Sequence, residues 1–163
     1  LIKKDINVSF VGSLETHAVR RIIRDLYNHK WLIKDTGEWH FYNKEGKINR
    51  EEYYKDTLSR SNITLCPRGT GPGSIRIWES LSSKSIPVVI GDNINLPYVF
   101  EGIIPVVSIH NVPVLDMVCE KILKNKPALD MMFDIHEKNT SNKNLHKIVE
   151  DYIRKADRFE VIT

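Results

Sequence analysis

Cysteine and long apolar runs are both scarce in this sequence. Its 163 residues include two cysteines, Cys66 and Cys119, which stand far apart in apolar surroundings without Cys-x-x-Cys or Cys/His spacing. Metal sites of the usual kind need such closely spaced ligands, so we predict two buried free thiols and no metal site. No apolar run approaches the roughly 18–20 residues that cross a bilayer, and we therefore predict no membrane span in this chain.

An excess of charge of one sign is also missing. The chain carries 24 Lys and Arg against 21 Asp and Glu, a formal net charge of +3, and the two signs alternate along the sequence. A nucleic-acid groove requires a basic stripe or patch, so we predict no nucleic-acid partner. The mild positive balance fits a small anionic ligand bound at one place.

Apolar runs typical of strands alternate with helical patterns along the chain. The length suits one domain and is short for two, so residues 1–163 are predicted to form a single domain. Predicted strands span 7–12, 31–35, 62–67, 86–91 and 104–110, and predicted helices span 15–30, 50–61, 74–83, 112–125, 127–138 and 143–157, with a loop at 36–50. Because the strands are continuous apolar runs, we predict an α/β fold with a Rossmann-like, doubly wound parallel sheet.

Ligands of such a fold bind where a strand turns into its helix. The turns after Gly12, Pro67 and Gly91 are therefore the candidate positions. The turn after Pro67 reads RGTGPG, and its glycines let backbone amides approach a ligand without obstruction by a Cβ atom. It lacks both the Gly-Lys-Ser/Thr of a P-loop and the G-x-G-x-x-G spacing of a dinucleotide fingerprint.

An oxyanion suits this turn. The following helix presents unpaired N–H groups and a positive dipole end, and Ser74 can act as its N-cap or as a hydroxyl donor to phosphate. Guanidinium groups match phosphate oxygens bidentately. The segment therefore predicts a diphosphate site made of Arg68, Gly69, Thr70, Gly71, Gly73, Ser74 and Arg76.

Glu79 lies one turn into the same helix, on the face that carries Arg76. A carboxylate there can accept hydrogen bonds from ribose hydroxyls while the phosphates stay at the helix start. Two plainer interpretations remain. The glycines can form a plain strand-to-helix turn that binds no ligand. Arg76 and Glu79 can form only an ion pair on the surface of the helix.

The stretch LCPRGTGPGSIRIWESLSSKSIPVVIGDNINLPY resembles the signature of the exostosin family of GT-B glycosyltransferases. The likeness comprises a Cys-Pro-Arg-Gly turn, a Ser-x-Arg-x-x-Glu helix start, an Ile-Pro-Val strand and a downstream Leu-Pro. Upstream, VSFVGSLETHAVRRII is similar to the family's Phe-x-Gly strand and arginine-bearing helix, so the resemblance covers roughly residues 7–125. One departure is local, because Lys84 and Ser85 stand where the family usually has a small residue, often Gly-Cys.

The resemblance implies the nucleotide-sugar-binding C-terminal half of an inverting, metal-independent transferase. Its substrates would be a nucleotide-sugar donor, with UDP as the nucleotide, and a glycan acceptor, and it would need no cofactor. A GT-B enzyme has two Rossmann-like domains, and 163 residues supply one. We therefore expect a chain excised from a longer protein, with the acceptor site and the catalytic base in the other domain.

Further residues join the site on this interpretation. Gly12 and Arg20 would complete the diphosphate site, although Arg20 could equally lie on a solvated helix face. Asp92 would contact the donor sugar or cap the next turn. His17 would cap its helix or approach the sugar, or it would be a surface histidine at the start of a helix. The aromatic loop residues would stack on a sugar or base, or form an edge cluster; they are Trp39, Phe41 and Tyr42.

Two other functions compete with the transferase. The first is a Rossmann-like module that binds a nucleotide or phosphorylated ligand and catalyses nothing. The second is a flavodoxin-like or receiver-type domain, which is disfavoured because the first strand ends in Gly-Ser without the acidic cluster of a magnesium site. The sequence does not assign a cellular compartment.

Overall fold

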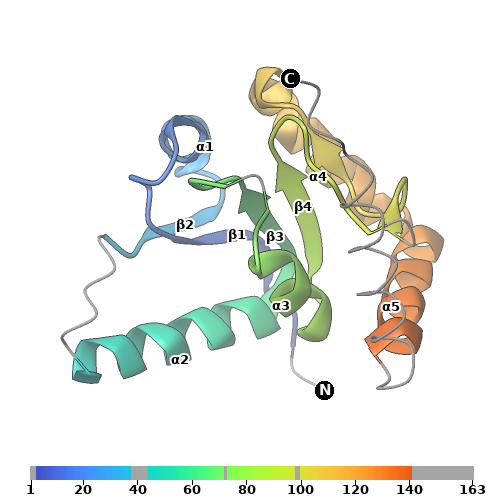
Figure 1. Ribbon diagram of the computed structural model, residues 1–163, viewed down its shortest axis with the longest axis horizontal. Coiled ribbons are helices and arrows are strands. Elements are labelled where there is room, and N and C mark those ends of the chain that lie inside the picture. Colours follow the sequence, from blue (N-terminus) through green and yellow to red (C-terminus); the bar gives the residue numbers. More distant parts are fainter. Residues whose placement is uncertain (1–2, 38–43, 72, 98–99, 141–163) are drawn as a thin grey trace, which may run out of the picture.

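A computed structural model describes residues 3–37, 44–71, 73–97 and 100–140. It contains one sheet of five strands in the order β2-β1-β3-β4-β5, with every pair parallel. Helices α2 and α3 lie on one side of the sheet, and α1 and α4 lie on the other (Figure 1). The predicted Rossmann-like parallel α/β fold is confirmed.

The strands are β1 (Ile6–Gly12), β2 (Leu32–Asp35), β3 (Ser61–Pro67), β4 (Ile86–Ile90) and β5 (Val106–Val107). The helices are α1 (Ala18–Tyr27), α2 (Lys44–Arg60), α3 (Arg76–Ser82), the 3₁₀ helix η2 (Ile109–Val114), α4 (Leu115–Lys124) and α5 (Lys126–Thr140).

Burial of the central strands organises the core. All five residues of β4 are buried, as are five of the seven in β1 and six of the seven in β3. Helix α1 covers the sheet with Val19, Ile23 and Tyr27, which recur every four residues. Ile22 and Leu26, also at helical spacing, are exposed instead. Both cysteines are free and buried, as predicted, and burial raises the pKa of each thiol to about 12.

Most elements differ from the sequence-based prediction by a few residues, and two of them differ more, at the start of α2 and in the fifth strand. Helix α2 begins at Lys44, so part of the predicted loop 36–50 is helical. Its sequence KEGKINR holds good helix formers and no proline, and one glycine did not stop it. The fifth strand shrinks from 104–110 to two residues, because Pro105 has no N–H for the ladder and η2 begins at Ile109. The predicted helix 127–138 lies within α5, whereas the predicted helix 143–157 falls outside the described residues, as do Trp39, Phe41 and Tyr42.

The turn before β4 shows why related sequences usually have small residues where this chain has Lys84 and Ser85. Lys84 has φ of +54°, in the left-handed region that glycine adopts without penalty. The next residue, Ser85, is fully buried, and its hydroxyl lies 2.7 Å from the hydroxyl of Thr64 on β3. A small residue is therefore favoured at both positions, and the lysine accepts a modest backbone strain.

The strand order places a topological switch point between β1 and β3. The helices that follow them, α1 and α3, lie on opposite sides of the sheet. In such folds the ligand crevice lies beyond the carboxyl ends of these two strands. The turns after Gly12 and Pro67 form its two rims. No helix among the described residues has the length and apolar character needed to cross a membrane.

Tyr27 joins α1 to the start of α4. Its hydroxyl donates to the Val112 carbonyl at 2.8 Å and accepts from the Leu115 N–H at 3.2 Å. Its ring stacks on Trp31 with the centroids 4.2 Å apart. One buried hydroxyl therefore bonds two backbone groups where η2 passes into α4, and these two groups also bond each other.

We expect Tyr27→Phe to lower the free energy of unfolding by about 0.5–1.5 kcal/mol, because it removes two buried hydrogen bonds while the Leu115 N–H still donates to the Val112 carbonyl. Chemical denaturation measures this change. Tyr53→Phe is the matched control, since Tyr53 is 42% exposed on α2. Equal stability of the two variants would contradict the assignment.

Candidate functional site

Three arginines converge where β1 and β3 end. Arg20 comes from α1, Arg68 follows β3, and Arg76 opens α3. The guanidinium carbons of Arg20 and Arg76 lie 5.4 and 5.1 Å from the centroid of the same ring, that of Phe10 on β1. None of the three arginines forms an ion pair with a carboxylate in the described part of the chain. The switch point thus holds a concentrated and uncompensated positive charge.

Arg20 is 8% exposed and binds both rims of the crevice. Its Nη1 donates to the Ser13 carbonyl at 2.9 Å, Nη2 to the Pro67 carbonyl at 3.1 Å and Nε to the Arg68 carbonyl at 3.0 Å. Burial, and secondarily the charge of Arg76, lowers the pKa of Arg20 to about 10. The alternative of a solvated helix face is therefore wrong, while the diphosphate contact of Arg20 stays a prediction.

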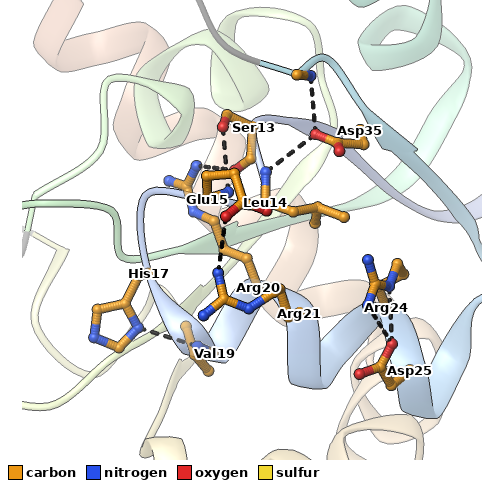
Figure 2. Close-up of polar contacts among 11 residues, drawn as sticks. Ser13, Leu14, Glu15, His17, Val19, Arg20, Arg21, Arg24, Asp25 and Asp35 are labelled. Atoms are coloured by element: carbon orange, nitrogen blue, oxygen red, sulfur yellow. Dashed lines mark hydrogen bonds and ion pairs between the residues drawn. The ribbon is translucent and has the colours of Figure 1, made fainter.

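Figure 2 shows how the start of α1 separates two adjacent arginines. Arg20 turns toward Ser13, while Arg21 lies at the surface, where its Nη1 is 3.2 Å from Glu15 Oε2. His17 caps the helix, since its Nδ1 accepts from the Val19 N–H at 3.1 Å. Burial lowers the pKa of His17, and the charges of Arg68 and Arg20 lower it further.

Arg68 and Arg76 each have one buried donor without a partner among the residues described. In both side chains this donor is the Nε atom. Arg76 uses only its Nη2, which donates to the Val11 carbonyl at 2.8 Å. A buried N–H without a partner costs about 1–3 kcal/mol, so such groups are rare and call for an explanation. Phosphate oxygens would satisfy both donors through charge-assisted hydrogen bonds once the side chains turn to expose them.

Two glycines make room for the guanidinium groups. A Cβ atom at Gly12 would lie 2.7 Å from Arg76 Nη2, and one at Gly69 would lie 3.0 Å from Arg20 Nη2. Gly71 and Gly73 are exposed, and no atom would lie within 4 Å of a Cβ there. Gly12 and Gly69 therefore admit arginines, a role that the glycine spacing did not predict. The exposed Thr70 shares the outer part of this turn.

Ser74 does not cap α3. The N-cap residue is Ile75, no side chain bonds to the helix start, and the Ser74 carbonyl accepts from the Ile77 N–H at 3.2 Å. The predicted N-cap role of Ser74 is wrong because the helix begins one residue later than that role requires. Its hydroxyl as a phosphate donor stays a prediction.

Glu79 has a partner that sequence reasoning missed. The hydroxyl of Tyr54, on α2, donates to Glu79 Oε2 at 2.6 Å. Burial raises the pKa of Tyr54 well above its usual value. Arg76 and Glu79 do not form the surface ion pair that their spacing allowed, in the part of the chain that the structure describes. The position of Tyr54 four residues before the buried Leu58, on one helix face, was the available signal.

A pocket of about 860 Å³ runs between α2 and α3 to the ends of β1 and β2. Four predicted site residues line it, namely Gly12, Arg20, Arg76 and Glu79. The other predicted residues lie outside this lining; they are Arg68, Gly69, Thr70, Gly71, Gly73, Ser74 and Asp92. The volume is in the range of small-molecule and cofactor sites.

Asp92 bonds the start of η2, a role that was not predicted from the sequence. Its Oδ1 accepts from the Ser108 hydroxyl at 2.7 Å and from the Ile109 N–H at 3.2 Å, at the start of η2. The hydrogen bond from Ser108 is the main cause that lowers the pKa of Asp92. Contact with a donor sugar stays a prediction. No group of three or more His, Cys, Asp or Glu residues that could hold a metal ion occurs in the described ranges.

Comparison with known proteins identifies the family. A family model described as the Exostosin GT47 domain matches residues 2–105, more than half of the chain. The chain belongs to the exostosin GT47 family. The resemblance seen over residues 7–125 is thereby confirmed for most of its length.

Relatives of this exostosin GT47 domain include a probable glucuronosyltransferase of Oryza sativa subsp. japonica, 34% identical over 101 residues, which cover 59% of the chain and 22% of that protein. A probable glucuronoxylan glucuronosyltransferase of Arabidopsis thaliana is 32% identical over 100 residues, which cover 59% of the chain and 21% of that protein. An exostosin-1 homolog of Caenorhabditis elegans is 30% identical over 105 residues, which cover 56% of the chain and 28% of that protein. The chain therefore matches less than a third of the length of each of these relatives.

We expect Arg20→Lys to lower the free energy of unfolding by about 2–3 kcal/mol, because an ammonium group cannot reach three carbonyls in the geometry of a guanidinium. Arg21→Lys, the neighbouring control, should change stability by less than about 0.5 kcal/mol. Thermal and denaturant unfolding of both variants measure the difference. A stable Arg20→Lys variant would show that the rims do not depend on this side chain.

Proposed function

We propose that this chain binds the sugar donor of a glycosyltransferase, a nucleoside diphosphate sugar with UDP as its nucleotide. The observation that carries the proposal is the pair of buried, unpartnered Nε–H groups of Arg68 and Arg76. They belong to a cluster of three arginines that has no carboxylate partner within the described residues. Membership of the exostosin GT47 family supports it, as do two relatives named as probable glucuronosyltransferases.

The diphosphate is assigned to the switch point, between Arg76 and the turn that carries Arg68. The ribose is assigned to Glu79, which lies about one turn further along α3 and lines the same pocket as Arg76. This spacing suits one ligand that carries an anionic end and a diol end. The sugar would then lie toward the open crevice beyond β1 and β3.

The arginines would assist departure of the nucleotide. Transfer breaks the bond between the anomeric carbon and a diphosphate oxygen, and the diphosphate leaves with the electron pair. Arg68 and Arg76 would stabilise the charge that grows on it, so this step needs no metal ion. A glycan hydroxyl would attack from the opposite face, which inverts the configuration, and its proton would pass to a base in a second Rossmann-like domain of a parent protein.

Metal independence is testable on the isolated chain. We expect it to bind UDP with the same affinity in excess chelator as with added divalent cation, because guanidinium groups supply the positive charge. Titration calorimetry in the two buffers measures this. The 163-residue chain alone should transfer no sugar. Binding that requires the cation would reject the arginine-based site.

Two substitutions separate phosphate from ribose recognition. Arg76→Ala should weaken UDP binding by about 1.5–3 kcal/mol and leave uridine binding unchanged, because only UDP offers the anion. Glu79→Ala should weaken both ligands. Arg24→Ala is the control, since it removes the same charge from the surface of α1, where Arg24 pairs with Asp25. Unchanged UDP affinity in Arg76→Ala and Glu79→Ala, with wild-type thermal melts, would refute the proposed donor site.

A further inference from the structure

Tyr54 touches both of the charged residues assigned to the ligand. Its hydroxyl donates to Glu79 Oε2 at 2.6 Å, and the guanidinium carbon of Arg76 lies 5.7 Å from the centroid of its ring. The same guanidinium lies 5.1 Å from the ring of Phe10. Tyr54 is half-buried and lines the pocket beside Arg76 and Glu79. One side chain of α2 therefore contacts two functional groups of α3 through different atoms.

The hydroxyl of Tyr54 restricts the orientation of the Glu79 carboxylate. A carboxylate has two acceptor oxygens, and the phenol engages Oε2. Oε1 has no hydrogen-bond partner among the residues that the structure describes. Because burial raises the pKa of Tyr54 far above neutrality, the phenol keeps its proton and remains a donor. The bond thus orients the carboxylate and leaves one oxygen for a ligand hydroxyl.

The ring of Tyr54 contacts a different group, the guanidinium of Arg76. A guanidinium near an aromatic ring is attracted by the ring quadrupole, and this attraction strengthens where water is excluded. Phe10 and Tyr54 together limit the positions that Arg76 can take. Its Nη2 is already bonded to the Val11 carbonyl, so the side chain is held from several directions.

We propose that Tyr54 is a positioning residue with two separable roles: its hydroxyl orients Glu79 for the ribose, and its ring holds Arg76 for the diphosphate. The inference rests on the proposed function, since it presupposes a nucleoside diphosphate in this pocket. Tyr54 itself need not touch the ligand. The competing interpretation is that its hydroxyl occupies the place of a ribose hydroxyl and must leave when the ligand binds.

Two substitutions of Tyr54 distinguish these roles. Tyr54→Phe keeps the ring and removes the hydroxyl, so the affinities for uridine and UDP should fall about fivefold to tenfold while that for inorganic pyrophosphate stays unchanged. Tyr54→Leu removes the ring as well, so the pyrophosphate affinity should also fall. Tyr53→Phe, at an exposed position of the same helix, should match the wild type for all three probes.

Coupling to Glu79 provides the decisive control. If Tyr54 acts through Glu79, then adding Tyr54→Phe to Glu79→Ala should cause no further loss of uridine or UDP affinity. A general loosening of the pocket would instead weaken pyrophosphate binding and add to the effect of Glu79→Ala. Thermal melts verify folding; if Tyr54→Leu does not fold, Tyr54→Phe still decides the role of the hydroxyl, and Tyr54→Met replaces Tyr54→Leu as the variant without the ring.

The outcomes separate the inference from the proposed function. If Arg76→Ala and Glu79→Ala weaken UDP binding but Tyr54→Phe binds uridine as tightly as the wild type or more tightly, the positioning role is overturned and the donor site stands. If the wild-type chain binds none of the three probes, both fall together. A selective loss of uridine and UDP affinity in Tyr54→Phe that vanishes in the Glu79→Ala background supports the inference.

Discussion

The bonds from Arg20 to three backbone carbonyls hold together the two loops on which the candidate site depends. Strands β1 and β3 are paired neighbours, but their helices leave on opposite sides of the sheet, so the ladder does not continue into the loops. The guanidinium of Arg20 bridges the two loops by donating to the carbonyls of Ser13, Pro67 and Arg68. Gly69 permits the approach, because a Cβ there would crowd Arg20 Nη2. The bridge thus ties the turn after β1 to the turn after β3.

The burial of Arg20 also has an electrostatic cost. It places a buried cation next to Arg76, and the depressed pKa of Arg20 records both the lost solvation and the repulsion. The ring of Phe10 attracts both guanidinium groups, although such an attraction offsets only part of the desolvation of a charge. The buried Nε donors of Arg68 and Arg76 point to the same requirement. A di-anionic ligand would supply the negative charge and the hydrogen-bond acceptors that the three arginines lack. This is the structural argument for the proposed diphosphate.

Much of the fold was predictable because it follows from local patterns. Continuous apolar strands alternating with helices indicated the parallel sheet, and the position of the turns after Gly12 and Pro67 followed from it. Errors arose where tertiary contacts override propensity. Ser74 has a good capping side chain, yet α3 begins beyond it, and the strand expected at 104–110 gives way to η2, where Asp92 bonds the backbone at Ile109. Arg20 and Arg21 are adjacent in sequence, and only packing decides which one turns inward.

The sequence by itself determined the chain's family, its α/β class and the presence of Arg68, Arg76 and Glu79 at one strand-to-helix junction, because these properties depend on residue type and short spacing. Only the tertiary structure decided what surrounds them. The strand order brings Phe10 and Arg20 to Arg76, and the packing of α2 beside α3 brings Tyr54 to Glu79 across 25 positions of sequence. No periodic pattern encodes these contacts, since each depends on how two separately formed elements pack against the same face or edge of the sheet.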